Sequence, residues 1–143
     1  AANRYLFNAY NRVDKACVSA QGSSHTNGSA TARQWNNGSG TLPRSRFIVG
    51  LESSKVLAGL TYRCYTSGAS GPNALAYLYL NGSDASLEAT QHFALYSADF
   101  AFQHAMSHIV QPRVGENFVD LYERDVGATL TWDNGFTWVN WNA

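Results

Sequence analysis

The chain has 143 residues, a mass of 15.6 kDa and a hydrophobic fraction of 45%, which suits one packed domain and excludes wholesale disorder. Charged residues make up only 14%, and the ten Lys and Arg balance the ten Asp and Glu. A net charge of zero argues against a nucleic-acid partner and against a polybasic membrane-surface site, because both need a surplus of cations. No apolar run approaches the roughly 20 residues of a spanning helix. We therefore expect one domain over residues 1–143, with no nucleic-acid partner and no membrane insertion.

The aromatic and glycine content favours a β-protein. The chain holds four Trp, eight Tyr, seven Phe and 12 Gly. Several long exposed helices would need more Glu, Lys and Arg on their outer faces than this chain contains. A sandwich instead needs aromatic and β-branched residues in strands, with Gly, Asn, Asp and Ser at turns.

The first half of the chain contains short strand-like runs around one long polar segment. Residues 21–41 are rich in Ser, Gly, Asn and Thr, with Trp35 as the single large apolar anchor. We expect this segment to be a surface excursion with a short strand at 30–35. The other strands predicted in this half are 4–9, 15–20, 46–51 and 57–66. Residues 67–72 form a turn cluster.

The second half alternates more strictly. Along 74–80, Leu75, Tyr77 and Tyr79 share one face and the opposite face is also apolar, as expected for a strand covered on both sides. Asn81-Gly82 predicts a hairpin-type turn, and Asp133-Asn134-Gly135 is the clearest hairpin signal in the chain. The remaining predicted strands are 86–97, 101–111, 117–123, 128–132 and 137–141.

One segment is ambiguous between helix and strand. Phe100, His104 and His108 would share one face of a helix over 100–110, but the neighbouring turn signals favour a strand. The chain then has eight to ten strands spaced by about 8–14 residues, without a longer repeat. The predicted fold class is all-β: an antiparallel β-sandwich of jelly-roll type, with a small barrel as the other solution.

The titratable residues show no metal or catalytic motif. His104 and His108 would lie about 13 Å apart on a strand, too far to bind one metal ion, and Ala105 stands where the zinc-protease motif needs Glu. Asp120 and Glu123 point to opposite faces of a strand, so paired carboxylates for glycoside hydrolysis would have to be distant in sequence. There is no Gly-x-Ser-x-Gly elbow. We expect no metal, no cofactor and no enzymatic activity.

The two cysteines leave the compartment open. A Cys17–Cys64 bridge would close a loop of about 48 residues and contribute at most about 4 kcal/mol. Two cysteines do not make a disulfide scaffold, so two buried thiols are the favoured interpretation.

Two aromatic triplets carry a ligand-binding hypothesis. Trp35-Asn36-Asn37 and Trp132-Asp133-Asn134 each place an indole beside polar turn groups, as sugar sites do. The alternative is that Trp132, with Trp138 and Trp141, packs in the core or at a subunit interface. Trp35 stands alone in a polar segment, which makes it the stronger candidate for a sugar platform.

The order of features near the C-terminus resembles the close of a tumour-necrosis-factor or complement-globular-head jelly roll. The segments are 106–111 (Met-Ser-His-Ile-Val-Gln), 114–122 with its Gly115-Glu116 turn, 127–132 and 136–141. The aromatic-Gly-x-Tyr strand of the globular heads is absent, and no binding motif of either family matches. Such domains are typically homotrimers packed through aromatic faces, and the fold recurs as knobs on bacteriophage tail needles, fibres and spikes.

The resemblance implies a knob of a trimeric viral or phage fibre-like protein, without catalysis. Such a knob would bind a cell-surface receptor or glycan and would lie at the virion surface or outside the cell. The alternative is a soluble carbohydrate-binding lectin that uses Trp35 and the loop Asn residues. A third hypothesis is a carbohydrate-active enzyme with carboxylates distant in sequence.

Overall fold

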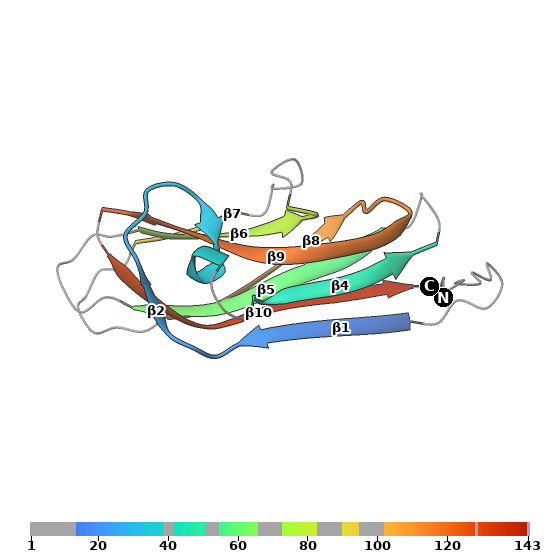
Figure 1. The fold of residues 1–143 in the computed structure, drawn as a ribbon, viewed down its shortest axis with the longest axis horizontal. Helices are drawn as coiled ribbons and strands as arrows, with labels where there is room; N and C mark the ends of the chain where they lie inside the picture. Colours follow the sequence, from blue (N-terminus) through green and yellow to red (C-terminus); the bar gives the residue numbers. More distant parts are fainter. Residues whose placement is uncertain are drawn as a thin grey trace.

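The computed structural model is a sandwich of two antiparallel sheets (Figure 1). It describes residues 14–38, 42–50, 55–65, 73–82, 90–94, 102–127 and 129–142. The strands in these ranges are β1 (Asp14–Gln21), β2 (His25–Asn27), β3 (Arg33–Gln34), β4 (Arg44–Val49), β5 (Val56–Tyr65), β6 (Asn73–Leu80), β7 (Thr90–Ala94), β8 (Phe102–Val110), β9 (Gly115–Val126) and β10 (Leu130–Asn142). A 3₁₀ turn, η1 (Trp35–Gly38), follows β3.

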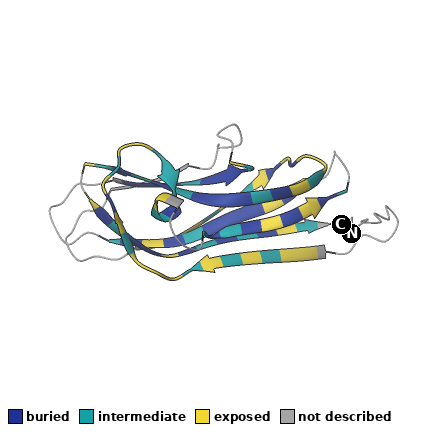
Figure 2. Cartoon of the chain, viewed as in Figure 1, coloured by how far each residue is buried: buried dark blue, intermediate teal, exposed yellow. Residues whose placement is uncertain are grey.

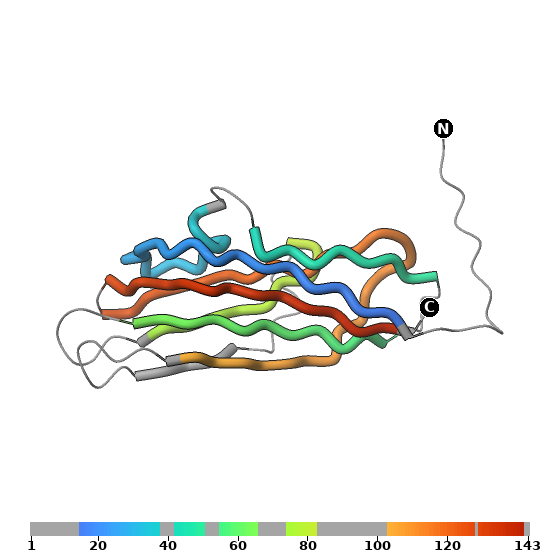
Figure 3. The backbone as a smooth tube through the Cα atoms, turned by 90° about the horizontal axis from the view of Figure 1, so that it is seen from below, coloured from blue at the N-terminus to red at the C-terminus, as the bar shows by residue number. Residues whose placement is uncertain are grey.

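The strand order is that of a jelly roll. Sheet A has the order β1-β10-β5-β8, with β2 added to β10, and sheet B has the order β3-β9-β6-β7, with β4 added to β9. The chain passes back and forth between the sheets, so consecutive long strands mostly lie in opposite layers. Figure 3 shows β1, β10, β5 and β8 side by side along the length of the molecule. The predicted all-β antiparallel sandwich of jelly-roll type is confirmed, with ten strands among the described residues.

Alternating side chains build the core between the two sheets. On β5, Val56, Leu60 and Tyr62 point inward and are fully buried, while Leu57 and Arg63 on the other face are exposed. Figure 2 shows the same division, with buried segments between the layers and exposed ones along the outer strand β1. Trp35, Trp132 and Leu121 are also among the largest fully buried apolar side chains of the core.

The strongest predicted hairpin is wrong. Residues 133–135 do not turn the chain back; they lie inside the single long strand β10, where the register with β5 shifts between Asp133 and Phe136. Asn134 has φ 50°, and an Asn in the left-handed region followed by Gly serves a β-bulge as well as a two-residue turn. The predicted strands 128–132 and 137–141 are therefore two parts of one bulged strand.

Other local predictions have mixed outcomes. The 101–111 segment is strand β8 rather than a helix, and Asn81-Gly82 forms the predicted turn, with φ 56° and 68°. The 21–41 excursion holds β2, β3 and η1, and the strand expected at 30–35 is confined to β3. The predicted strand at 4–9 and most of the turn cluster at 67–72 lie outside the described residues.

The two cysteines are free thiols on sheet A. Cys64 on β5 is fully buried, and burial raises the pKa of its thiol to about 12. Cys17 on β1 is half-buried, and β10 lies between the two strands. The expectation of unbridged thiols is confirmed, although Cys17 is less buried than expected.

Candidate interaction surfaces

Trp35 and Trp132 lie in the core rather than at the surface. Both are 0% exposed, and their rings meet edge to face with centroids 6.0 Å apart. The ring of His25 covers another side of Trp35 at 4.8 Å. Gly135, at the bulge of β10, approaches so closely that a Cβ there would lie 2.7 Å from Cζ2 of Trp35. A fully buried indole cannot stack on a ligand, so the predicted Trp35 and Trp132 sugar platform is wrong.

The polar members of the two triplets do not form a shared site around these rings. Asn36 and Asn37 lie in η1 with positive φ, and Asn37 is exposed. Asp133 is 5% exposed and accepts two hydrogen bonds from Arg63, one of them from Nε at 2.7 Å. The exposed Asn134 donates to Asp133 Oδ1 at 3.2 Å. The structure brings the two tryptophans together, leaves Asn37 and Asn134 exposed, and pairs Asp133 with Arg63.

A buried carboxylate anchors the polar excursion to the sandwich. Glu123 on β9 is 0% exposed and accepts a hydrogen bond from His25 Nε2 at 2.6 Å and one from Arg33 Nε at 3.1 Å. Arg33 also donates to the carbonyl oxygen of Thr26 at 3.1 Å. Both partners of Glu123 come from the 25–34 segment, so this contact fixes that segment against sheet B. His25 and Arg33 contact the two carboxylate oxygens of Glu123, one each. These contacts give the buried carboxylate a structural role.

A second buried carboxylate lies two residues further along β9. Asp125 accepts the Trp132 indole N–H at 2.9 Å and the Leu130 backbone N–H at 3.1 Å. Burial raises the pKa of Asp125 to about 7, and the two hydrogen bonds act in the opposite direction. Asp125 therefore orients Trp132 in the core. Among the described residues, no group of His, Cys, Asp and Glu could hold a metal ion.

The outward face of sheet B combines aromatic rings with an ion pair. Arg44 on β4 contacts Asp120 through Nε at 2.6 Å and through a second nitrogen at 2.7 Å, and Gln34 donates to the same carboxylate at 3.2 Å. The Arg44 guanidinium lies 4.1 Å from the ring centroid of Phe118. The hydrogen bond to Asp120 raises the pKa of Arg44 above its ordinary value. Arg44 and Asp120 therefore satisfy each other's charge, with Asp120 buried and Arg44 partly exposed.

Three tyrosines continue this face across β6 and β9, and together they are called the tyrosine face below. The rings of Tyr79 and Tyr122 stack with centroids 3.7 Å apart and an interplanar angle of 11°. Tyr77 meets Tyr79 edge to face at 6.3 Å. Tyr77 and Tyr122 are half-buried, and Tyr122 lies between Gln34 of β3 and Tyr77 of β6 in the sheet. Such rings with neighbouring hydrogen-bonding groups are typical of recognition surfaces.

The outward face of sheet A is different, because it carries no charge over three successive rows. The register places four residues side by side in each row, one from each of β1, β10, β5 and β8. The rows are Ala16, Asn140, Leu57 and Ile109; Val18, Trp138, Gly59 and Ser107; and Ala20, Phe136, Thr61 and Ala105. These twelve residues are called the uncharged face below.

Exposure makes the uncharged face the stronger candidate for association. Val18 is 66% exposed, Ile109 60% and Leu57 41%. Leu57 and Ile109 are direct cross-strand partners, and Val18 pairs with Trp138. Scattered exposed aliphatic residues are ordinary, but an apolar face across four strands marks an interaction surface. On sheet B, by contrast, the outward charges and rings already contact one another.

Comparison with known proteins supports the fold alone. No protein-family profile matches the sequence, and no curated protein matches it. A solved structure of Eiger TNF from S. frugiperda is similar, with a TM-score of 0.52, 12% identity, and coverage of 91% of this chain and 93% of that one. Dimeric latent PorU from Porphyromonas gingivalis gives a TM-score of 0.55 at 16% identity, over 92% of this chain and 13% of that one.

A viral protein shares the same architecture. The structure of T=1 particles derived from infectious bursal virus gives a TM-score of 0.50 at 12% identity, over 90% of this chain and 31% of that chain. This chain therefore spans about an eighth of PorU and about a third of the viral protein. These similarities place it among jelly-roll domains that include a TNF and a viral particle protein. Within the described ranges, no helix is long and apolar enough to cross a membrane.

Sequence reasoning did not find either surface. The alternation of Phe118, Asp120 and Tyr122 along 117–123 is visible in the sequence, and so is that of Tyr77 and Tyr79. The sequence does not reveal that β6 pairs with β9. With that pairing known, the alternation would have indicated one aromatic face. The uncharged face has no comparable local signal, because each strand contributes only three of its twelve residues.

Proposed function

We propose that this chain is a binding domain without enzymatic activity, assembled as a homotrimer through the uncharged face. We place it at a virion surface or outside the cell, as the knob of a fibre-like protein that binds a cell-surface receptor or glycan. The observation that carries the proposal is the set of three uncharged rows across β1, β10, β5 and β8. Val18 and Ile109 on this face are more than half exposed in the single chain.

Burial of this face in an assembly is favourable for two reasons. Each Å² of apolar surface removed from water contributes about 25 cal/mol, and no charge on the twelve residues has to be desolvated. A rotation of 120° that brings the face of one copy against the edge of the next closes into a ring of three. Homotrimers are also what the resemblance to tumour-necrosis-factor jelly rolls implies.

The opposite layer leaves a surface free for recognition. If sheet A faces the other copies, the tyrosine face of sheet B points away from them. Tyr and Arg are enriched among residues that dominate binding energies. Here Tyr122 lies two residues beyond Asp120, the register partner of Arg44, and pairs with Tyr77 of β6. The assembled knob would thus present three copies of this face to a receptor.

The absence of catalysis is supported by the state of the central carboxylates. Glu123 is held by His25 and Arg33, and Asp120 is held by Arg44 and Gln34. A general acid or nucleophile needs an oxygen that can reach the substrate. Both groups are instead 0–1% exposed and engaged in pairs within the chain.

A matched pair of substitutions tests the assembly. Val18→Asp adds a charge to the uncharged face, whereas Val114→Asp adds the same charge at a site that is 55% exposed between β8 and β9. Light scattering on a sizing column should show the wild-type mass for Val114→Asp and the mass of one chain for Val18→Asp. The same mass for both variants would contradict assembly through this face.

Carbohydrate binding is a second candidate, moved from Trp35 to the tyrosine face. The half-buried Tyr77 and Tyr122 offer apolar ring surfaces for sugar C–H groups, and Gln34 of β3 is the register partner of Tyr122. A glycan array probed with wild type and with Tyr77→Ala tests this candidate. It predicts that a glycan bound by wild type is lost in the variant. Retained binding, or no bound glycan, would remove it.

A further inference from the structure

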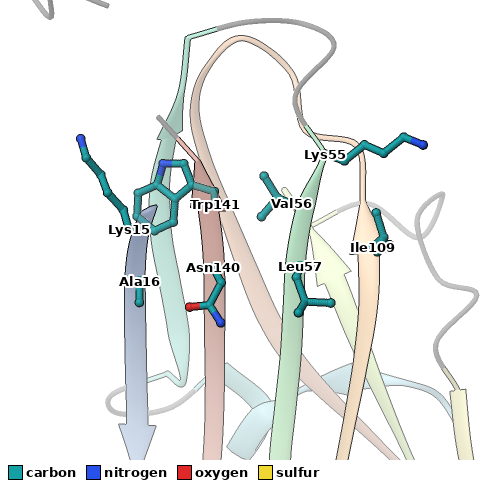
Figure 4. Close-up of a pocket in the computed structure, with 8 residues that line it drawn as sticks. All are labelled: Lys15, Ala16, Lys55, Val56, Leu57, Ile109, Asn140 and Trp141. Carbon is teal, nitrogen blue, oxygen red and sulfur yellow. The ribbon is translucent and has the colours of Figure 1, made fainter. Parts of the chain in front are cut away.

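Both lysines of the chain line one groove. The 143-residue sequence contains only Lys15 and Lys55, and they flank a groove of about 620 Å³ at one end of sheet A (Figure 4). Lys15 lies on β1 opposite Trp141 of β10, and Lys55 directly precedes β5. The other lining residues are Ala16, Val56, Leu57, Ile109, Asn140 and Trp141.

Within the described part of the chain, neither lysine forms an ion pair. Four arginines, Arg33, Arg44, Arg46 and Arg63, each pair with a carboxylate, but neither lysine takes part in such a pair. The described residues that line the groove include no Asp or Glu. A site with two cations and no carboxylate among its lining residues favours an anion.

The floor between the lysines is apolar. Leu57 and Ile109 lie side by side as a cross-strand pair and are 41% and 60% exposed. The Trp141 ring borders the floor on the Lys15 side (Figure 4). A volume of about 620 Å³ lies within the range of small-ligand sites, which are mostly apolar with a few polar groups that fix orientation. The apolar floor therefore favours a ligand with an apolar part, and the lysines at the two margins favour a negative charge on that ligand.

We propose that this groove binds an amphipathic anion, a carboxylate or sulfonate carried on an apolar chain or ring. The apolar body would cover Leu57 and Ile109, and the acidic group would meet one of the two lysines. Figure 4 shows the lysine side chains at opposite margins of the groove, with the two amines pointing away from each other and from the residues between them. Each amine ends a flexible four-carbon stem that can turn toward a ligand.

This proposal goes beyond the proposed function and does not depend on it. The groove includes the first row of the uncharged face, but it lies at the end of the sheet where Lys15 and Lys55 are located. A trimer assembled through that face would cover Leu57 and Ile109, so the anion would bind the single chain and would compete with a neighbouring copy for this row. Molar mass is therefore recorded for every variant, so that a change in assembly is separated from a change in ligand binding.

Anilinonaphthalene sulfonate is a suitable probe, because it joins a sulfonate to aromatic rings and fluoresces in apolar surroundings. Titration of wild type with the probe should give saturable binding. Decanoate should displace the probe, and the neutral decanol should displace it far less. Equal displacement by decanol would show apolar binding without charge recognition and would overturn the proposal.

The lysines are tested by substitutions that keep their length. Lys15→Met with Lys55→Met removes both charges and keeps apolar stems, so the probe should bind about tenfold more weakly, a loss of about 1.4 kcal/mol. Lys15→Arg with Lys55→Arg should retain the affinity within about threefold. Arg113→Met removes an exposed cation away from the groove and should change nothing. An unchanged affinity in the double Met variant would overturn the proposal.

Discussion

The indole of Trp138 occupies the space above Gly59 on the neighbouring strand. A Cβ on Gly59 would lie 2.2 Å from Cζ2 of Trp138 and 2.7 Å from the carbonyl oxygen of Met106. The two residues are register partners of β5 and β10 in the middle row of the uncharged face. The glycine thus allows the largest ring of that face to lie against the sheet.

Gly59→Ala should destabilise the protein, because the new methyl group meets a backbone oxygen that cannot move freely. We expect a loss of about 1–3 kcal/mol in the free energy of unfolding, as for other overpacked sites. Gly22→Ala is the control, since the nearest atom to its Cβ is Asn134 Oδ1 at 3.9 Å. Urea unfolding of both variants gives the comparison. Equal stability would contradict the close contact.

Trp35→Ala should also destabilise the protein, because the indole is fully buried against Trp132 and His25. A cavity of this size costs about 3–5 kcal/mol. A surface sugar platform would predict an almost unchanged melting temperature. Thermal unfolding monitored by circular dichroism distinguishes the two cases. Thr26→Ala, an exposed residue of β2, should stay within about 0.5 kcal/mol of wild type.

Two glutamates of β9 provide a matched test of buried and exposed ion pairs. Glu123→Gln leaves Arg33 without its counter-charge and removes the carboxylate partner of His25 at a site that is 0% exposed, and should cost about 3 kcal/mol. Glu116→Gln breaks the ion pair with Arg46. Both side chains of this pair are about 60% exposed, so the substitution should cost less than about 1 kcal/mol. Chemical denaturation measures both. A larger loss for Glu116→Gln would be inconsistent with the anchoring role of Glu123.

Asp125 gives a pH-dependent prediction. Its pKa rises from 3.8 to about 7 in the folded chain, so the folded state holds its proton more tightly than the unfolded state. The resulting stabilisation is fully present below about pH 3.8 and is lost as the pH rises through about 7. Asn at this position cannot titrate.

The stability of wild type relative to Asp125→Asn should therefore be greater at about pH 4.5 than at about pH 8. Urea unfolding of the two proteins at both pH values measures the difference, and the other titrating groups cancel in the comparison. A difference that stays constant between the two pH values would refute the raised pKa.

Local patterning predicted most of the framework and little of the surface chemistry. The strands at 57–66, 74–80 and 117–123 could be predicted because side chains of two kinds alternate within each of these segments. Residues 133–135 were misassigned because an Asn-Gly pair with positive φ fits both a hairpin and a bulge. The partner strands decide between the two, and they are distant in sequence.

The burial of Trp35 shows the same limit. Its sequence neighbours are polar, which indicated an exposed loop, but its ring contacts Trp132, almost a hundred residues further along the chain. The uncharged face likewise depends on the register among β1, β10, β5 and β8. No single strand reveals that Val18, Trp138 and Gly59 lie in one row.

The molar mass of the wild-type chain in solution tests the central claim most directly. Light scattering on a sizing column should give about 47 kDa, three times the 15.6 kDa of one chain. A mass near 16 kDa across the working concentration range would contradict assembly through the uncharged face, and with it the trimeric knob.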